Sequence, residues 1–365
     1  MPKAARVGKK STAYKQNSKK SGQVINKTSL HYIFACVFAL IFLVSFGTYK
    51  IFTIDFASAN SDSTFIHAKQ LLNLHALILL EVSDEFDTQD ASTYLLKSVK
   101  VVFYEKKTGN IDVLTLNSKA LVDYPKKIGE ESLDKSLQLG YSVADKKMDY
   151  GSDYARVVVQ QYLGYPIDDY VLYKTSNKDL IDSMYITSGG LSTLSSVWSV
   201  GLSSSTFENS IDSKLFLTSM SFKDYLSLYR GSLATQTNVT NGIDFDEPAF
   251  DTYVQSLYAR NPSDFVSGSS VAILNSTNIS GLAKQGSRVV QNSGGYLLTT
   301  DNARENYDKT TLIIDSYDNP YAYVLYRYFD MSLENVRLIK DSTQILEPIL
   351  DRADVTLIIS FDNSP

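Results

Sequence analysis

The sequence predicts an α/β protein that begins with one transmembrane helix and continues as two α/β domains outside the cytoplasm. Three observations predict this class. An uncharged apolar run separates a basic tail from a long, mildly acidic remainder. Strand and helix patterns then alternate from about residue 71 to 184, and they alternate again from residue 270 to the end. A chain of 365 residues is long enough to bury two such cores.

The amino-terminal tail is strongly basic. Residues 1–30 hold seven lysines and one arginine with no acid, whereas the rest of the chain holds 27 basic and 40 acidic residues. Lysine and arginine retain such a tail in the cytoplasm, where it contacts the anionic lipid of the bilayer. We also considered nucleic-acid binding, but no folded recognition motif accompanies the tail, so no nucleic-acid partner is expected.

Residues 31–53 form the predicted transmembrane helix. At ~1.5 Å per residue, ~20 apolar residues span the ~30 Å hydrocarbon core of a bilayer. Tyr32 and Tyr49 stand where interfacial aromatic residues are common. A cleaved signal peptide is the alternative, because Ala57-Ser58-Ala59 fits the pattern of a cleavage site. We favour the anchor, which makes this a single-pass protein of the cell membrane.

Few residue types are available for metal or nucleophilic chemistry outside the membrane. The single cysteine, Cys36, lies within the apolar run, so disulfides and thiol catalysis are excluded from the remainder. His67 and His75 are the only histidines after the apolar run, which leaves little material for a zinc site or a Ser-His-Asp triad. We therefore predict no metal-ligand cluster.

The first block opens with three strands. Ala76–Leu80 reads as a buried strand, and Val99–Tyr104 and Ile111–Leu116 read as a hairpin. The turn between the hairpin strands, Glu105–Asn110, contains Gly109, which adopts a positive φ without strain.

A helix and a further strand follow in the first block. Gly151–Leu163 has helical periodicity, with Ser152 or Asp153 as the expected cap. Gly164 is expected to end the helix, and Asp169–Tyr173 is the next strand. The residues expected on the buried face of the helix are Ala155, Val158, Val159 and Tyr162.

The second block repeats the alternation and predicts a self-contained α/β sandwich domain over residues 270–365. We expect Leu274, Leu282, Ile313 and Ile358 to share one core. The first domain is predicted over residues 54–260, with a linker at 261–269. The expected strands and helices are 271–274, a helix to about 291, 296–299, 310–314, a helix over 320–329, 336–339 and 354–359.

Three motifs of the second block resemble the LytR C-terminal domain. Val271-Ala-Ile-Leu-Asn-Ser-Thr-Asn-Ile-Ser-Gly-Leu-Ala283 matches the opening strand and turn of that family. Lys309-Thr-Thr-Leu-Ile-Ile314 resembles a later strand, and Ala353-Asp-Val-Thr-Leu-Ile-Ile-Ser-Phe-Asp362 resembles the closing one. The resemblance implies a binding or spacer module.

The first block is similar to the LytR-CpsA-Psr domain. Glu105-Lys-Lys-Thr-Gly-Asn-Ile-Asp-Val113 resembles a family hairpin, and Val122-Asp-Tyr-Pro125 resembles the turn after it. Leu163-Gly-Tyr-Pro-Ile-Asp-Asp-Tyr-Val-Leu172 resembles a later strand. The resemblance implies a bacterial cell-envelope protein whose partners are cell-wall glycopolymer or peptidoglycan. Active members of the family transfer a pyrophosphate-linked glycan, which arginines clamp and which aspartates contact directly or through Mg²⁺.

This chain departs from the family at the residues that would hold pyrophosphate. Ser118 stands where the family has an arginine, and Lys119 stands where it has an aspartate. From residue 56 to 250 the only arginines are Arg156 and Arg230, and a three-arginine clamp cannot be built from two residues. Arg156 lies on a predicted helix beside the polar Gln160 and is expected to be solvated or to contact the wall.

Two functional hypotheses follow from this departure. The first is a non-catalytic pseudoenzyme that binds or scaffolds wall polymer and needs no cofactor. The second is a working glycopolymer–peptidoglycan phosphotransferase with a rebuilt site and Mg²⁺ as cofactor. If the protein is active, the candidate catalytic residues are Lys97, Lys119, Asp87 and Asp90, because lysine binds phosphate as a point charge.

Overall fold

The computed structural model describes residues 63–87, 94–125, 128–143, 148–186, 216–219, 237–240, 247–259, 269–342, 345 and 347–360. The predicted basic tail, the predicted transmembrane helix and the predicted linker up to residue 268 lie outside these ranges. Within them, no helix combines the length and apolar character needed to cross a membrane. The chain divides into two units, Met1–Thr53 and Ile54–Pro365, and the second unit has the mixed α/β character that the sequence predicts.

The first block is built on a six-stranded sheet with the order β7-β6-β1-β2-β3-β8. The central strands β1, β2 and β3 are antiparallel, whereas β6 runs parallel to β1 and β8 runs parallel to β3. The strands are β1 (Leu74–Val82), β2 (Ser98–Glu105), β3 (Ile111–Leu116), β6 (Asp169–Lys174), β7 (Phe216–Thr218) and β8 (Thr237–Thr240). A separate hairpin pairs β4 (Leu121–Tyr124) with β5 (Gly129–Ser132).

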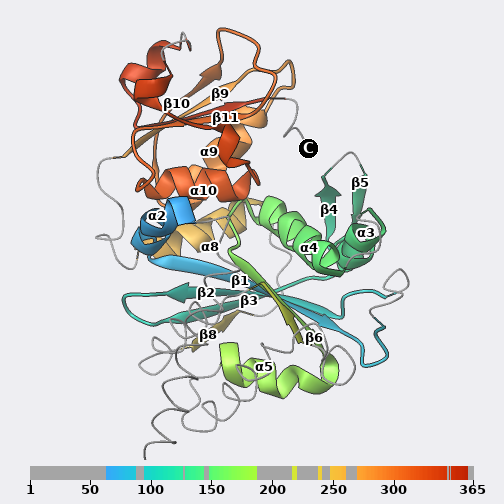
Figure 1. The fold of residues 1–365 in the computed structure, drawn as a ribbon. Coiled ribbons are helices and arrows are strands. Elements are labelled where there is room, and N and C mark those ends of the chain that lie inside the picture. The colour runs from blue at the N-terminus through green and yellow to red at the C-terminus, as the bar shows by residue number, and fades with distance from the viewer. Residues whose placement is uncertain are drawn as a thin grey trace, which may run out of the picture. The chain divides into compact units, whose positions relative to one another are not determined.

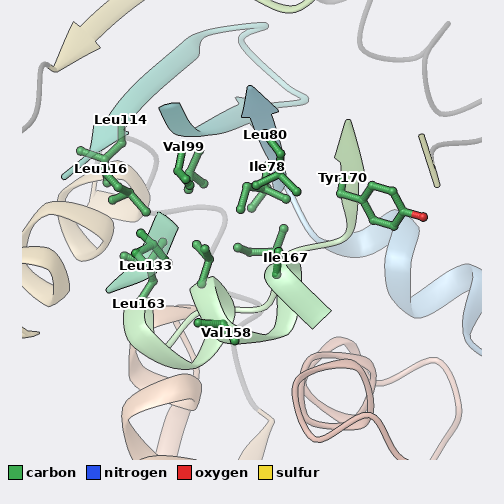
Figure 2. Close-up of a cluster of buried hydrophobic side chains, with 14 of the residues drawn as sticks. Ile78, Leu80, Val99, Leu114, Leu116, Leu133, Val158, Leu163, Ile167 and Tyr170 are labelled. Atoms are coloured by element: carbon green, nitrogen blue, oxygen red, sulfur yellow. The ribbon is translucent and has the colours of Figure 1, made fainter. Parts of the chain in front are cut away.

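Helices cover both faces of this sheet (Figure 1). On one face, α3 (Ser136–Val143), α4 (Met148–Leu163) and α8 (Glu247–Ala259) pack over a large apolar cluster. In Figure 2, Ile78, Leu80 and Val99 of the sheet point toward Val158 of α4. The other face forms a smaller cluster under α5 (Lys178–Tyr185). Both faces are therefore buried, which explains why β1 and β6 read as continuous apolar runs.

The predicted elements of the first block are confirmed, with one change at the start of α4. The hairpin turn has Gly109 at φ +71°, and Gly164 at φ +60° ends the helix. The helix begins at Met148 rather than near Gly151, so Ser152 lies inside it and is buried instead of capping it. Asp153 forms an ion pair with Arg156, one turn later in the helix. Its carboxylate therefore does not cap the helix as expected.

The second block is a five-stranded sheet with the order β10-β9-β13-β11-β12. Its strands are β9 (Ser270–Asn275), β10 (Tyr296–Asn302), β11 (Thr311–Ile314), β12 (Val336–Leu338) and β13 (Val355–Ile359). Two helices, α9 (Leu282–Asn292) and α10 (Pro320–Tyr328), pack on one face. The side chain of Asn319 accepts a hydrogen bond from the backbone of Tyr321 and caps α10. Every predicted strand and helix of this block is present, and the bounds agree within one or two residues except at the end of β10, which continues to Asn302 instead of ending near residue 299.

One prediction about this core is wrong. Leu282 packs with the helices on one face of the sheet, whereas Leu274, Ile313 and Ile358 form a separate cluster on the other face. Successive side chains of a strand point to opposite faces, so residues from the same strands divide between two cores.

A short helix near the start of the described chain completes the core of the second block. This helix is α2 (Ile66–Leu71), preceded by a 3₁₀ turn at Ser63–Phe65. Phe65, Ala68 and Leu72 are buried in the same cluster as α9 and α10. The ring of Phe65 lies 4.8 Å from that of Tyr326. Nothing in the local sequence pattern of residues 63–72 indicates that they pack with α9 and α10.

Candidate functional site

The carboxyl ends of three strands of the first block share one edge of the sheet. Glu81 of β1 is opposite Ser98 of β2, and Val99 of β2 is opposite Leu116 of β3. Parallel pairing also places the end of β1 beside Lys174 at the end of β6. In open α/β sheets, ligands bind outside the carboxyl ends of the strands. We call this region, with the turns that follow β1, β3 and β6, the carboxyl edge.

The structure brings two of the four candidate residues to the carboxyl edge. Lys97 directly precedes β2, and Lys119 lies in the turn after β3. Asp87 follows β1 and is exposed, whereas Asp90 lies outside the described residues. The catalytic role of these four residues stays a prediction.

Lys119 neutralises a buried carboxylate of its own chain. Its ammonium group forms an ion pair with Asp134, whose side chain is 2% exposed, while the side chain of Lys119 is 70% exposed. Ser132 Oγ donates a second hydrogen bond to the same carboxylate at 2.5 Å. The backbone of Asp134 also donates to Ser118 O at 2.8 Å and accepts from Leu96 N at 2.9 Å. The sequence analysis did not identify Asp134 as part of the site. Burial of a carboxylate is unfavourable unless it is paired and hydrogen-bonded, and these partners meet that need.

Lys97 takes part in a second polar cluster. Its ammonium group donates to Thr175 Oγ1 at 3.4 Å, and Thr175 Oγ1 lies 3.1 Å from Glu81 Oε1. Tyr173 Oη donates to Glu81 Oε2 at 3.5 Å. Glu81 itself is buried, and burial together with its carboxylate raises the pKa of Tyr173, which therefore stays protonated. Lys97 is therefore linked to the carboxylate of Glu81 only through the hydroxyl of Thr175.

A third group of charged side chains, on the side of α5, also pairs lysines with a carboxylate. Asp182 lies between Lys100 Nζ at 3.0 Å and Lys178 Nζ at 2.7 Å. Burial opposes the charged form of Asp182, but the hydrogen bonds from Lys178 and Lys100 outweigh it and hold its pKa below the usual range. At the turn after β1, Asp84 accepts from Ser176 N at 2.7 Å, which likewise lowers the pKa of Asp84. Lys119, Lys100 and Lys178 are thus paired with carboxylates, whereas Lys97 donates to a threonine hydroxyl.

Arg156 lies away from the carboxyl edge and is buried, so the expectation of a solvated or wall-contacting residue is wrong. Its side chain is 1% exposed. Nε contacts Asp153 at 2.7 Å, and Nη1 donates to Gln160 Oε1 at 3.2 Å and to Ile167 O at 3.0 Å. Ile167 precedes β6, so the hydrogen bond from Arg156 fixes the backbone at the amino end of that strand. Arg230 lies outside the described residues.

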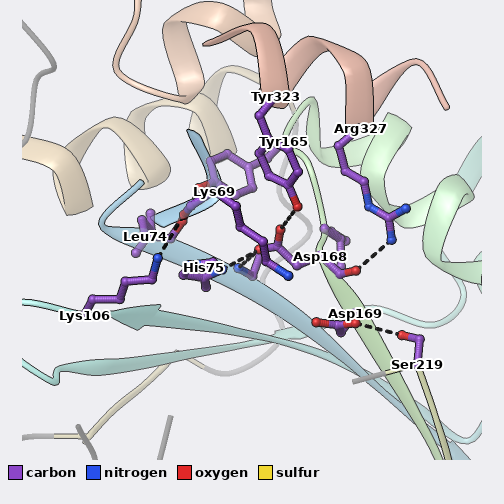
Figure 3. A network of polar contacts seen from close by, with 12 residues as sticks. Lys69, Leu74, His75, Lys106, Tyr165, Asp168, Asp169, Ser219, Tyr323 and Arg327 are labelled. Carbon is purple, nitrogen blue, oxygen red and sulfur yellow. Dashed lines mark hydrogen bonds and ion pairs between the residues drawn. The ribbon is translucent and has the colours of Figure 1, made fainter. Parts of the chain in front are cut away.

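Asp168, at the amino end of β6, joins the two blocks (Figure 3). Its Oδ2 lies 3.0 Å from His75 Nδ1, and Tyr323 of α10 donates to its Oδ1 at 3.2 Å. Arg327 Nη2 donates to the backbone oxygen of Asp168 at 2.8 Å. Burial alone would raise the pKa of Asp168, but His75, Lys69 and Arg327 hold it below its usual range. The charged carboxylate therefore links the first block to the second. The sequence analysis did not identify this role.

No family model matches the chain, and no curated protein matches it either. Solved structures that are similar to it include LytR-CpsA-Psr proteins. The crystal structure of TagV from B. subtilis has 10% sequence identity and a TM-score of 0.35, with 52% of this chain and 97% of that chain covered. The LytR-CPS2A-psr family protein YwtF (TagT), with bound octaprenyl pyrophosphate lipid, has 11% identity and a TM-score of 0.31, with 51% and 90% covered. A transcriptional regulator from Enterococcus faecalis has 14% identity and a TM-score of 0.33, with 53% and 89% covered.

Proposed function

We propose that this protein is a membrane-anchored component of the bacterial cell envelope that binds or scaffolds wall glycopolymer without transferring it. The tail would lie in the cytoplasm, residues 31–53 would cross the membrane, and both α/β blocks would face the wall. The assignment to a cell-envelope family rests on the ordered sequence motifs of the two blocks.

The charge balance at the carboxyl edge is the observation that carries the non-catalytic part of the proposal. Pyrophosphate concentrates several negative charges, and a site that holds it needs donors with a surplus of positive charge. Lys119 and Lys100 instead pair with Asp134 and Asp182. Arg156 is buried among other partners. A pyrophosphate group would have to displace these ion pairs and would leave carboxylates facing it.

The alternative function is transfer by a rebuilt site. It is favoured by the position of Lys97 and Lys119 at the same edge, because lysines can bind phosphate as point charges. In that case Mg²⁺ would offset the carboxylates, and Asp87 and Asp90 would be candidates to contact it.

A transfer assay separates the two functions. The full-length protein in lipid nanodiscs is incubated with polyprenyl-pyrophosphate-linked glycan, peptidoglycan fragments and Mg²⁺, and covalent product is measured. We expect no product above a control without protein, because loss of even one charge-stabilising donor commonly costs ~10²–10³ in rate. We also expect the same preparation to sediment with isolated cell walls.

A control enzyme and two variants complete this assay. A LytR-CpsA-Psr transferase that retains its arginines verifies that the substrates are competent. Product formation that disappears in Lys97→Ala or Lys119→Ala would establish the alternative. Failure to sediment with walls would contradict the binding function, whatever the turnover.

The membrane topology has a separate test. Protease added to intact cells should digest the two blocks and leave the basic tail protected, because positively charged segments stay in the cytoplasm. Digestion of the tail with survival of the blocks would reverse the orientation. A mature amino terminus at Asn60 would instead establish a cleaved signal peptide.

A further inference from the structure

A small polar cavity opens in the second block. Its volume is about 230 Å³. The cavity is lined by Ser276, Asn278, Asn306, Tyr307, Asp308 and Ser360. Pockets for drug-sized ligands usually exceed roughly 300 Å³, so this cavity fits a smaller group.

The cavity occupies the position in the sheet where α/β folds commonly bind ligands. Strands β9 and β13 are parallel neighbours, and Ser276 and Ser360 directly follow their carboxyl ends. From β9 the chain continues through α9 to β10 on one side, whereas β11 lies on the other side of β13. Ligands of open α/β sheets bind outside the carboxyl ends of the strands, which is where this cavity lies.

The floor of the cavity is fixed by buried hydrogen bonds. The backbone N and the Oγ of Ser276 both donate to Ile359 O at 2.9 Å. Ser360 N donates to Thr310 Oγ1 at 2.9 Å, and Ser360 Oγ donates to the backbone oxygen of Tyr307. Both serines are buried. A floor that is already ordered loses little conformational entropy when a ligand binds.

The rim is held from both sides. In the turn after β9, Asn275 donates to Ile279 O at 2.8 Å and accepts from Thr277 N at 2.9 Å. On the opposite side, Tyr307 Oη donates to the buried Glu347 at 3.3 Å. Burial and this carboxylate raise the pKa of Tyr307 to about 12, so its hydroxyl stays a donor to Glu347 at neutral pH.

Three side chains of the lining remain available to a ligand. Asn278, Asn306 and Asp308 are exposed, and their side chains form no hydrogen bond to the part of the chain that the structure describes. The two amides offer both donors and acceptors, and the carboxylate offers acceptors. The described residues of the lining include no lysine, arginine or histidine, which disfavours a phosphate group.

We propose that this cavity binds a single neutral sugar ring of a glycan. Sugar hydroxyls both donate and accept hydrogen bonds, which suits amides beside a carboxylate, and the ring of Tyr307 adds an apolar surface. The choice of a wall glycan as the source of the ring rests on the proposed function. The cavity itself is independent of the carboxyl edge of the first block.

Saturation-transfer NMR on the full-length protein in nanodiscs tests this proposal with three probes, N-acetylglucosamine, glucose and galactose. We expect at least one probe to bind. Asn278→Ala and Asp308→Ala should each weaken that probe about five- to tenfold, the usual effect of one lost hydrogen bond. Asp341→Ala, an exposed carboxylate of the same block outside the lining, is the matched control and should bind like the parent.

Three outcomes would overturn the proposal: no probe binds, the lining variants bind as tightly as the control, or Ca²⁺ alone binds at these residues. Wall sedimentation of the same variants keeps the two proposals distinct. If the lining variants still sediment with walls and no sugar binds, the cavity proposal fails and the proposed function stands. If sugar binding is lost in the variants but the parent does not sediment with walls, the proposed function fails instead.

Discussion

Replacing Phe65 with alanine is expected to lower the free energy of unfolding of the unit from residue 54 onward by about 3–5 kcal/mol. The side chain is fully buried. Its ring contacts those of Tyr326 and Tyr317, with centroids 4.8 and 5.5 Å away. Alanine would leave a cavity among large aromatic rings that cannot collapse around it. The loss should therefore approach the upper part of the range for a buried phenylalanine.

Urea unfolding of the full-length protein in detergent, followed by circular dichroism, measures this loss. His67→Ala is the matched control, because His67 is exposed on the same short helix. A surface substitution of this kind usually changes stability by less than about 0.5 kcal/mol. Equal midpoints for Phe65→Ala and His67→Ala would mean that α2 does not pack with the second block in solution.

Arg156→Ala is expected to cost roughly 2–4 kcal/mol, since buried partners would lose a charged donor and a large cavity would open. Arg156 is among the largest fully buried side chains of the described residues. Ile167 O would lose its hydrogen bond from Nη1, whereas Asp153 is 42% exposed and would be hydrated.

Arg156→Met distinguishes the two origins of this cost. Methionine restores most of the volume and removes a charge whose Nη2 atom has no hydrogen-bond partner among the described residues. Replacement of a buried charge by an apolar side chain of similar size is often tolerated, so we expect less than about half of the loss seen with alanine. A loss in Arg156→Met as large as in Arg156→Ala would assign the stabilisation to the charge rather than to packing. Wall binding of the folded variants should not change, because Arg156 is buried and does not line the cavity of the second block.

Local sequence patterns identified the central strands of both blocks and the helices α4, α9 and α10, but not α2, α3, α5 or α8. Apolar runs with β-branched residues marked β1, β6 and β13, and Gly109 and Gly164 marked a turn and a helix end. These features depend on neighbours in the chain, where residue periodicity and backbone preference decide the outcome.

The partners of charged residues could not be predicted in the same way. Lys119 and Asp134 are 15 residues apart, and nothing in the local pattern around Lys119 indicates a buried carboxylate nearby. Arg156 was misjudged because its neighbour Gln160 is polar, but both side chains are buried, and Gln160 donates to Tyr328 O in the second block at 2.9 Å. Tertiary contacts, rather than helical periodicity, decide whether such residues face water.

The packing of Phe65, Ala68 and Leu72 against α10 also determines when these side chains become buried during synthesis of the protein. Residues 63–72 are made early, but the helix that covers them is made near the end of the chain. Contacts this distant in sequence form late, because the intervening chain must close a long loop first. A product that terminates before α10 would keep these apolar side chains in water, where they invite aggregation or proteolysis. The burial of Phe65, Ala68 and Leu72 is therefore conditional on synthesis of the chain through α10.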